Sequence, residues 1–412
     1  MSAPAADGAV RAAPGPTVDG HARPHLPATH YLDNRIFTDP QIFADEQRAI
    51  FAKVWQFICH ESEVAAPGDF RCTQLAGKPV VLVRGEDGAV RGFYNVCRHR
   101  AAEVVREPAG NAKQFQCFYH HWTYGLDGAL RSVAKPAGYQ AVDLDKGELG
   151  LVPVRTETLA GLVFACLDPD AAPLAEFLGE ITAPLLAPLG TAPLEVFHFH
   201  KTVVHANWKL WQDNNSERYH SMLHALNRKT QPWVLGRTSP MKLRISPNGH
   251  SGYWSDGAAT VAYERGNYSG ITGGTLPGMR DNEMRVVNLF PDLMINIRSN
   301  VVRIDRMVPL DATRTLVEWR GLGVKGDDEA MRAIRVHHHN MVWGPAGRNL
   351  PEDILAVESQ YRSMQADVVR YSILAREEDL NPTDDANLRA YYAEWGRRVG
   401  RDPSSPYGAA AE

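Results

Sequence analysis

Two short cysteine–histidine motifs lie in the first half of the chain. Cys97 and His99 form a Cys-x-His motif, Cys117 and His120 form a Cys-x-x-His motif, and seventeen residues separate His99 from Cys117. Each pair can lie on one tight loop, so two loops could close around a small inorganic cluster, with two thiolates on one iron and two imidazoles on the other. Neutral imidazoles in place of two thiolates would raise the reduction potential of such a cluster.

Zinc is an alternative metal for these four residues, because two cysteines and two histidines also suit a tetrahedral structural site. The Cys-x-His spacing argues against a zinc finger, in which a Cys-x₂₋₄-Cys pair precedes a His-x₃₋₅-His pair. A further alternative is that two buried cysteines lie near two histidines by chance. The spacing favours the iron–sulfur cluster over both alternatives.

A second set of candidate metal ligands lies in residues 207–226, a polar segment that is compatible with an unbroken helix. His220 and His224 would be one turn apart on that helix, with Glu217 on the same face. Two imidazoles and one carboxylate, with open positions for O₂ and substrate, form the ligand set of non-haem ferrous oxygenases. The alternative is a pair of surface histidines.

The carboxylate of such a ligand set need not be local. Glu352 and Asp353 follow a turn rich in glycine and proline at residues 344–351, where a helix is expected to begin. Either acid is a candidate ligand. Both can also be explained as residues in the first turn of a helix, where they interact favourably with the helix dipole.

The elements that must position these residues fall into two regions. Residues 39–55 have apolar positions at helical spacing, and residues 56–167 have short β-rich runs separated by turn signals such as Pro67-Gly68 and Asp127-Gly128. The second region predicts a small all-β domain. The downstream half predicts helices against a mostly antiparallel sheet; the helical segments are 173–189, 207–226, 327–341 and 351–376, and the strand segments are 194–204, 284–308 and 314–323.

The composition is that of an ordinary soluble globular protein, with 44% hydrophobic and 22% charged residues. A formal net charge of −4 gives no electrostatic case for binding nucleic acid or an anionic membrane. No apolar run approaches the roughly 20 residues of a membrane helix. Residues 1–28 are expected to form a disordered tail, and the odd, sparse count of 5 cysteines favours a reducing cytoplasm.

The pattern Cys-x-His-x₁₇-Cys-x₂-His, with Arg98, Arg100, Trp122 and Tyr124 around it, resembles the Rieske domain of aromatic ring-hydroxylating oxygenases. With the downstream histidine segment, the resemblance covers roughly residues 36–360 and is to the α subunit of a Rieske non-haem iron oxygenase. It implies an α+β fold in which a β-rich Rieske domain is joined to a helix-grip catalytic domain. The expected boundaries are an N-terminal helical segment of the catalytic domain at 29–55, the Rieske domain at 56–170 and the catalytic domain at 171–412.

The same resemblance implies which residues hold the two cofactors. It places the carboxylate ligand at Asp353 rather than Glu352, because the family has a Gly-x-Ala-Gly segment followed by acidic residues. Two departures are present: the family usually has Asp where this chain has Glu217, and its two histidines are more often separated by four residues than by three. The implied ligands are Cys97, His99, Cys117 and His120 for a [2Fe–2S] cluster, and His220, His224 and Asp353 for a mononuclear Fe(II).

The reaction implied by the resemblance uses O₂ and two electrons from NAD(P)H to dihydroxylate or hydroxylate a small molecule. The electrons come from a separate reductase, with or without a ferredoxin, since no G-x-G-x-x-G fingerprint follows a strand here. A homotrimer is implied, with or without a small β subunit, in which Glu217 bridges His120 of one copy and His220 of the next; the alternative is a glutamate on a helix surface. Alternative functions are a monooxygenase or demethylase for a sulfonate or quaternary amine, a non-catalytic Rieske electron carrier, and a zinc-stabilised binding module.

The substrate prediction rests on arginines in residues 296–306, a segment of strand-like sequence in the catalytic half. Arg298, Arg303 and Arg306 interrupt an otherwise apolar run, and at least one could point towards the iron pocket. A buried arginine needs an anionic partner, which is either Asp305 within the chain or a substrate anion. The favoured substrate is therefore a small aromatic acid, with an alkyl or aryl sulfonate next. Asn214 is a further candidate for substrate contact.

Overall fold

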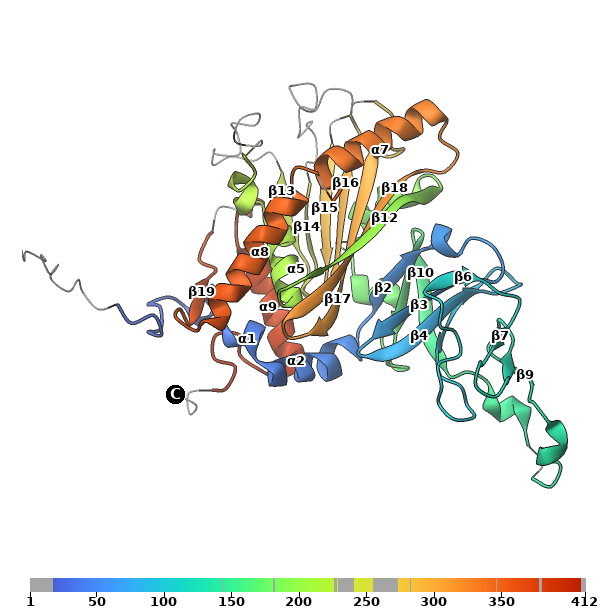
Figure 1. The fold of residues 1–412 in the computed structure, drawn as a ribbon. Helices are drawn as coiled ribbons and strands as arrows, with labels where there is room; N and C mark the ends of the chain where they lie inside the picture. The colour runs from blue at the N-terminus through green and yellow to red at the C-terminus, as the bar shows by residue number, and fades with distance from the viewer. Residues whose placement is uncertain are drawn as a thin grey trace, which may run out of the picture.

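Strand-forming runs of the sequence assemble into two seven-stranded antiparallel sheets, which lie side by side in Figure 1. The computed structural model of the protein describes residues 18–408, apart from residues 143, 181, 226–227, 229–240, 255–272, 282, 346 and 378–379. The predicted α+β architecture, a β-rich domain joined to a domain of helices and antiparallel sheet, is confirmed. No described helix combines the length and the apolar character that a membrane span requires.

The first sheet has the strand order β2-β11-β10-β5-β4-β3-β6. A three-stranded sheet, β7-β8-β9, comes between β6 and β10 in the chain and lies at one end of the molecule (Figure 1). The run Val80–Val83 is fully buried in β4, as expected of consecutive apolar residues, most of them β-branched, in a central strand. The bounds of the strands are β2 Gln56–His60, β3 Asp69–Leu75, β4 Lys78–Arg84, β5 Val90–Tyr94, β6 Ala109–Asn111, β7 Phe115–Gln116, β8 Thr123–Tyr124, β9 Leu130–Ser132, β10 Pro153–Leu159 and β11 Leu162–Cys166.

The second sheet has the order β12-β18-β17-β16-β15-β14-β13 and forms the core of the downstream half. Each strand pairs with its sequence neighbour except β12, which pairs with β18 across the length of the segment. The bounds are β12 Leu194–Val204, β13 Lys242–Ile245, β14 Ser251–Trp254, β15 Met284–Leu289, β16 Leu293–Arg298, β17 Val301–Asp311 and β18 Arg314–Val324.

Helices cover this second sheet. Helix α7 packs on β17 and β18, whereas α5 packs on β15, β16 and β17 and also contacts α8 and α9. A two-stranded sheet, β1 (Tyr31–Asp33) with β19 (Tyr371–Ile373), ties the start of the described chain to the segment after α8. The helix bounds are α1 Arg35–Thr38, α2 Pro40–Glu46, α3 Leu174–Leu178, α4 Ala183–Leu186, α5 Trp208–Ser216, α7 Glu329–Trp343, α8 Leu350–Gln365 and α9 Ala386–Val399.

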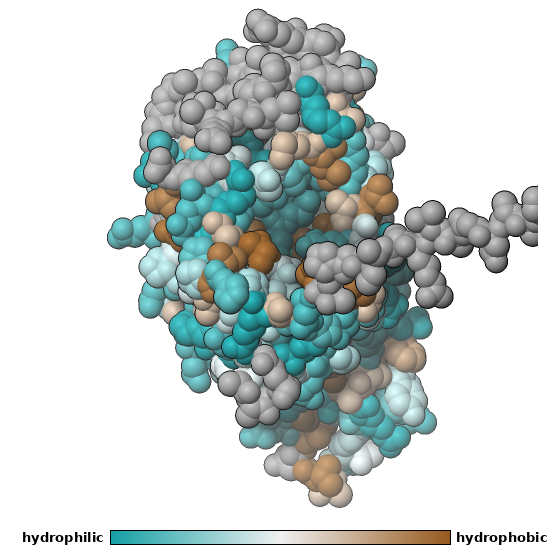
Figure 2. All heavy atoms as spheres, turned by 90° about the vertical axis from the view of Figure 1, so that its left-hand side faces the viewer, coloured by the Kyte–Doolittle hydropathy of each residue, from teal (hydrophilic) through white to brown (hydrophobic). Residues whose placement is uncertain are grey.

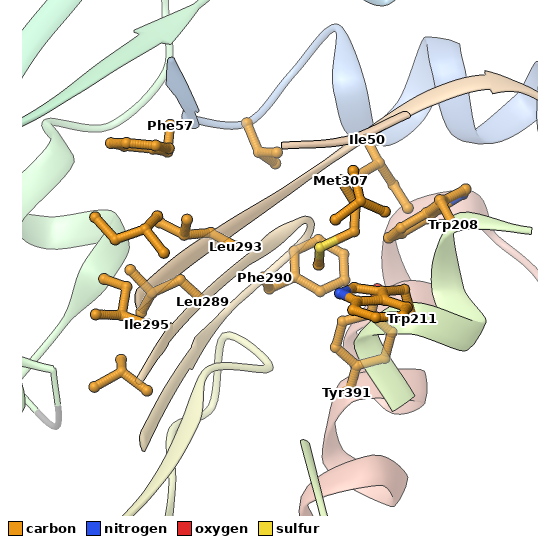
Figure 3. Close-up of a cluster of buried hydrophobic side chains, with 14 of the residues drawn as sticks. Ile50, Phe57, Trp208, Trp211, Leu289, Phe290, Leu293, Ile295, Met307 and Tyr391 are labelled. Atoms are coloured by element: carbon orange, nitrogen blue, oxygen red, sulfur yellow. The ribbon is translucent and has the colours of Figure 1, made fainter. Parts of the chain in front are cut away.

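One large apolar core joins the helices, the second sheet and part of the first. Figure 3 shows Trp208 and Trp211 of α5 and Tyr391 of α9 near Met307 and Phe290 of the sheet region. Phe57, on β2 of the first sheet, belongs to the same cluster, so the two halves share buried apolar surface. This shared core fixes the position of one domain on the other within the chain.

Two predicted helices and the predicted tail differ from the structure. The helix predicted over 173–189 is divided into α3, α4 and a 3₁₀ turn at Ala187–Gly190, and the helix predicted over 351–376 ends at Gln365. The disordered tail predicted for residues 1–28 is wrong for its last part, because the Gly20 carbonyl accepts a hydrogen bond from the Arg370 N–H. Residues 1–17 lie outside the described residues.

Candidate active site

The two cysteine–histidine motifs lie on tight loops that follow β5 and β7. In each loop the cysteine carbonyl accepts a hydrogen bond from the residue four positions later, Ala101 or His121, and both of these residues have a positive φ. The same backbone conformation therefore occurs twice, as expected if two loops close around one cofactor. This geometry agrees with the tight loops that the spacing predicts.

The side chains of these loops converge. Cys97 and Cys117 are buried free thiols that interact with each other, and the Nδ1 atoms of the half-buried His99 and His120 are 3.1 Å apart. Two sulfurs on the inside and two imidazole nitrogens towards solvent fit the asymmetric ligand set of a Rieske cluster. The four residues are therefore arranged to hold a [2Fe–2S] cluster.

Aromatic residues around the loops orient these ligands. The Tyr124 hydroxyl lies 3.3 Å from Cys97 Sγ and accepts a hydrogen bond from the Arg98 N–H, and the Trp122 ring is stacked on His99 with a centroid separation of 4.9 Å. A hydroxyl directed at a cluster thiolate stabilises its negative charge and so tunes the reduction potential.

A second set of ligand atoms meets at the wall of a cavity in the downstream half. His220, His224 and Asp353 each offer an atom within 4.8 Å of the others. Asp353 Oδ1 is 3.8 Å from His220 Nε2 and 3.5 Å from His224 Nε2. This oxygen is buried and has no hydrogen-bond partner among the described residues, which is costly for a carboxylate unless a cation lies beside it. The residues present therefore fit a divalent metal ion.

The segment that carries the two histidines is not the unbroken helix that the sequence predicts. Helix α5 ends at Ser216, Glu217 is extended (φ −120°, ψ 162°), and a 3₁₀ turn covers Tyr219–Met222. The break frees the Glu217 carboxylate, which lies 2.8 Å from His220 Nδ1 and accepts a hydrogen bond from the His220 N–H at 3.0 Å. Glu217 thus orients His220 instead of lying one helical turn before it.

Glu352 is a functional residue whose role the sequence does not reveal. It was a candidate ligand, but its Oε2 lies 2.8 Å from His224 Nδ1, on the ring nitrogen that does not face Asp353. Adjacent residues on a helix point in different directions, so Glu352 and Asp353 in the first turn of α8 reach different atoms of the site. The adjacency of two acids at a helix start was the only signal in the sequence.

Burial and charge act against each other in this site. Burial lowers the pKa of His220, but the Glu217 carboxylate outweighs it, so the pKa is raised above its ordinary value. Burial raises the pKa of Asp353, although His220 and His224 oppose the shift. Without a metal the buried carboxyl retains its proton more readily, and a cation between the three side chains removes that penalty.

Asn214 is absent from the wall of the cavity that contains both histidines, but it lines a second cavity whose wall also includes Glu217 and His220. The Asn214 amide opposes the rise in the pKa of the Asp353 carboxyl, and its neighbour Asn215 lines the histidine-containing cavity. The predicted contact between Asn214 and substrate stays a prediction.

The arginine-containing segment forms a hairpin and not one strand. Strand β16 ends at Arg298, β17 begins at Val301, and Arg298 and Val301 pair across the turn. Arg303 pairs with Asn296, which places both of them on the same face of the sheet as Arg298. All three line the cavity that contains the histidines.

The three arginines have different partners. Arg303 forms a buried ion pair with Asp305, with Nε 2.7 Å from Oδ1. This is the partner within the chain that the sequence offered in place of a substrate anion. Arg306 lies on the opposite face and donates to Thr73 Oγ1 of β3 at 2.8 Å, so its predicted role in substrate binding is wrong. Arg298 lies with its guanidinium carbon 4.9 Å from the centroid of the Trp343 ring.

The wall of this cavity, hereafter the histidine cavity, combines polar and aromatic residues: Asn215, Glu217, Arg218, His220, Ser221, His224, Tyr253, Met284, Met294, Asn296, Arg298, Arg303, Trp343, Asn349 and Asp353. A second cavity, of about 600 Å³, also includes Glu217 and His220 and is lined further by residues of α8 and β19. Figure 2 shows apolar side chains among polar ones on the face of the molecule that carries these two elements, where Leu355, Val369 and Ile373 are exposed.

Comparison with known proteins agrees with both sites. Residues 54–144 match the Rieske [2Fe-2S] domain family, and residues 192–395 match the ring hydroxylating alpha subunit (catalytic domain) family. The α subunit of 2-aminobenzenesulfonate 2,3-dioxygenase from Alcaligenes sp. is 40% identical over 385 residues, which cover 92% of this chain and 95% of that protein. The hydroxylase α subunit of methanesulfonate monooxygenase from Methylosulfonomonas methylovora is 35% identical over 400 residues, covering 93% and 95%.

Solved structures share the fold. Naphthalene 1,2-dioxygenase from Rhodococcus sp. bound to indole superimposes with a TM-score of 0.78 at 22% identity, over 90% of this chain and 94% of that one. A quaternary ammonium Rieske monooxygenase superimposes with a TM-score of 0.73 at 23% identity, over 92% and 100%. The resemblance found in the sequence motifs is confirmed: the chain belongs to the Rieske non-haem iron oxygenases, as an α subunit that carries a [2Fe–2S] cluster and a mononuclear iron.

Proposed function

We propose that this chain hydroxylates or dihydroxylates a small anionic molecule at an Fe(II) held by His220, His224 and Asp353. The observation that carries the proposal is the buried, unpartnered Asp353 Oδ1, which faces both histidine Nε2 atoms at the wall of the histidine cavity. The iron, when bound, would supply the position at which O₂ is activated beside the substrate. Electrons would come from NAD(P)H through a reductase and the cluster on the two cysteine–histidine loops.

Carboxylates hold the protons of the two imidazoles away from this metal position. Glu217 lies 2.8 Å from His220 Nδ1, and Glu352 lies 2.8 Å from His224 Nδ1. Each carboxylate keeps a proton on Nδ1, so the lone pair on Nε2 points to the third ligand, Asp353. The Asn214 amide lies near that ligand and lowers the pKa of its carboxyl.

The electron route we propose runs between two copies of the chain. Within one chain, the loops around β7 and β9 lie at one end of the molecule, whereas α5 lies in the other half, against the second sheet and beside α8 (Figure 1). His120 stands beside Phe118 and Tyr119, two exposed aromatic side chains, so this tip can dock on an apolar surface. The second cavity, with Glu217 and His220 in its wall and Ile373 at the same segment of β19, offers such a surface to a second copy in a homotrimer.

The residues of the histidine cavity and the similar proteins both support the proposal that the substrate is an anion. Arginine residues outnumber the two carboxylates of its wall, and both carboxylates are engaged by histidines. Two relatives that cover more than nine-tenths of the chain are named for sulfonate substrates. A quaternary amine, the alternative substrate, would carry its positive charge towards Arg298, which is electrostatically unfavourable.

The proposal is tested with the purified protein, a reductase, NADH and ¹⁸O₂, with product mass as the measurement. Wild-type protein is expected to transfer one or two labelled oxygen atoms to an organic anion. Cys117→Ser is expected to lose the visible absorption of the cluster, whereas His224→Ala is expected to retain the absorption and form no product. Turnover by His224→Ala at the wild-type rate would contradict the iron assignment.

A further inference from the structure

The cationic groups of the histidine cavity are not equally neutralised. Arg303 is paired with Asp305, and the Arg218 guanidinium donates to Met241 Sδ at 3.7 Å. Among the residues that the structure describes, Arg298 has no ion pair, and its Nε is buried without a hydrogen-bond partner. Arg298 is therefore a cation of this wall for which the described residues supply no compensating charge.

The carboxylates of the cavity wall cannot supply the missing charge. Glu217 is engaged by His220 Nδ1, and Asp353 faces both histidines at the proposed iron position. His338, a titratable group that is stacked on the ring of Trp343, has a pKa well below its ordinary value because of burial and then of the nearby Arg298, so it stays neutral. Placing a guanidinium here is costly unless a bound anion pairs with it.

The guanidinium is held in position by stacking. Its central carbon lies 4.9 Å from the centroid of the Trp343 ring, and His338 is stacked nearly parallel to the same ring, with 14° between the planes and 5.8 Å between centroids. Cation–π contact fixes the planar fork without using its N–H donors. The donors thus remain available to a planar or tetrahedral anion in the cavity.

An amide stands on the same face of the hairpin. Asn296 is 7% exposed, lines the histidine cavity, and has a side-chain oxygen without a hydrogen-bond partner among the described residues. An amide can present either its oxygen or its NH₂ group to a ligand. The fork of Arg298 can bind two oxygens of an anion, and the Asn296 amide can bind a third oxygen or a donor group next to the anion.

We propose that Arg298 is the specificity-determining residue for the substrate, and that the group it binds is a sulfonate. A sulfonate offers three acceptor oxygens and stays ionised throughout the pH range in which the protein is folded, so it compensates Arg298 permanently, whereas a carboxylate offers two oxygens. This inference rests on the proposed function, because it names the substrate class of the same cavity. The iron and Arg298 would hold the two ends of the substrate, so that the atom to be oxidised faces the metal position.

The test is equilibrium binding by calorimetry to the oxidised holoenzyme without reductant, so that no turnover is needed. The probes are benzenesulfonate and methanesulfonate, the neutral benzenesulfonamide and methanesulfonamide, and the carboxylates benzoate and acetate. Arg298→Met is the principal variant and Arg298→Lys keeps the charge without the fork. Arg314→Met, at the exposed end of β18, is the matched control.

Wild type and Arg314→Met are expected to bind one of the sulfonates more tightly than its sulfonamide and its carboxylate. Arg298→Met should weaken sulfonate binding by roughly 10- to 100-fold, as expected for the loss of a charged hydrogen-bonding partner, and leave sulfonamide binding unchanged. Arg298→Lys should give an intermediate loss. Unchanged cluster absorption and iron content would show that the variants fold.

Equal sulfonate affinity in wild type and Arg298→Met would overturn the role of Arg298. Tighter binding of the carboxylates than of both sulfonates, or no sulfonate binding by wild type, would overturn the sulfonate assignment. A protein that binds sulfonates through Arg298 but forms no oxygenated product with reductase would leave this inference standing and contradict the proposed oxygenase function instead.

Discussion

His220 is held by the Glu217 carboxylate and His224 by the Glu352 carboxylate. Substitution of Glu352 tests whether such a carboxylate contributes to iron binding. Replacing Glu352 with Ala removes the acceptor at His224 Nδ1, so the imidazole loses its fixed orientation and some basicity. Iron affinity is expected to fall by about 10- to 100-fold, with the loss in Glu352→Gln smaller because an amide oxygen still accepts a hydrogen bond. The measurement is iron retained after dialysis against graded chelator, with labile sulfide as the internal reference.

The exposed Glu176→Gln on α3 serves as the control for removal of a negative charge. If Glu352→Ala retained iron as strongly as this control, Glu352 would have no part in holding the metal site.

Asp213 provides a pH-dependent prediction. Burial raises its pKa from 3.8 to about 7, although the Tyr392 hydroxyl donates to it and Lys209 lies near. The folded protein therefore keeps a proton that the unfolded chain releases, so stability falls as the pH rises from about 4 to about 7. In wild type, the free energy of unfolding should fall by roughly 2–4 kcal/mol over that range, and Asp213→Asn should abolish this fall. The measurement is the melting temperature as a function of pH.

Asp170→Asn, at an exposed position, should keep the pH dependence of wild type. A pH profile of Asp213→Asn that superimposes on the wild-type profile would show that this carboxyl is not the titrating group.

For single residues, the sequence indicates which side chains can bind a metal, but it does not indicate which side chains they contact. The motif Cys97–His120 and the pair His220 and His224 are local patterns, so they were visible in the sequence. The roles of Glu352 and Arg306 depend on which way neighbouring residues point, and a two-residue turn at Ser299-Asn300 sets that direction for the arginines. Ser299 and Asn300 are turn-favouring residue types, but the strand-like sequence on both sides of them obscured that signal.

Among the secondary-structure elements, the break after α5 shows why the spacing of the histidines alone was insufficient to predict the backbone between them. The interval from His220 to His224 suits a helix, but Asn214, Asn215 and Ser216 precede the break, and side chains of this kind compete with the backbone for hydrogen bonds. The Ser216 hydroxyl donates to the Gln212 carbonyl, and Glu217 binds the His220 N–H. These local contacts end the helix and turn the two imidazoles towards α8.

The N-terminal helical segment is anchored to the catalytic helices by one buried carboxylate, and this gives a prediction for Glu46. Glu46 accepts hydrogen bonds from Trp208 and Trp395 Nε1, both at 2.8 Å, and forms a fully buried ion pair with Lys209. Glu46→Ala would leave the ammonium without a partner, at a cost of about 3–5 kcal/mol. The measurement is the free energy of unfolding in urea, followed by tryptophan fluorescence.

Glu61→Gln, at an exposed position in the Rieske half, is the control. A loss below about 1 kcal/mol in Glu46→Ala would mean that water or another group compensates Lys209.

For the whole molecule, the sequence predicted two domains of different texture, and the sheets agree with that division. It did not predict how the domains meet. Arg320 of β18 binds Glu63 and the Ile58 carbonyl, and Arg306 of β17 binds Thr73, so buried arginines of one sheet are partly satisfied by the other. These contacts, which leave Arg306 Nε without a partner among the described residues, join residues more than 200 positions apart in the chain, and no local pattern indicates them.

Electron transfer between copies predicts that two inactive variants complement each other. Cys117→Ser lacks the cluster and His224→Ala lacks the iron, so each homotrimer should be inactive. Co-expressed mixtures should recover roughly one quarter of wild-type turnover, because random assembly of a cyclic trimer places an intact cluster beside an intact iron at some interfaces. Mixing the two proteins after assembly is the control. Full inactivity of co-expressed trimers with both metals present would indicate transfer within one chain.

The central claim is that three side chains of the downstream half hold an iron separate from the cluster, and iron and acid-labile sulfide per chain test it most directly. Wild type is expected to contain about three irons and two sulfides. Asp353→Asn should contain about two irons with unchanged sulfide and cluster absorption, because only the mononuclear ion depends on that carboxylate. Three irons in Asp353→Asn, or a colourless wild type with one zinc per chain, would contradict the account.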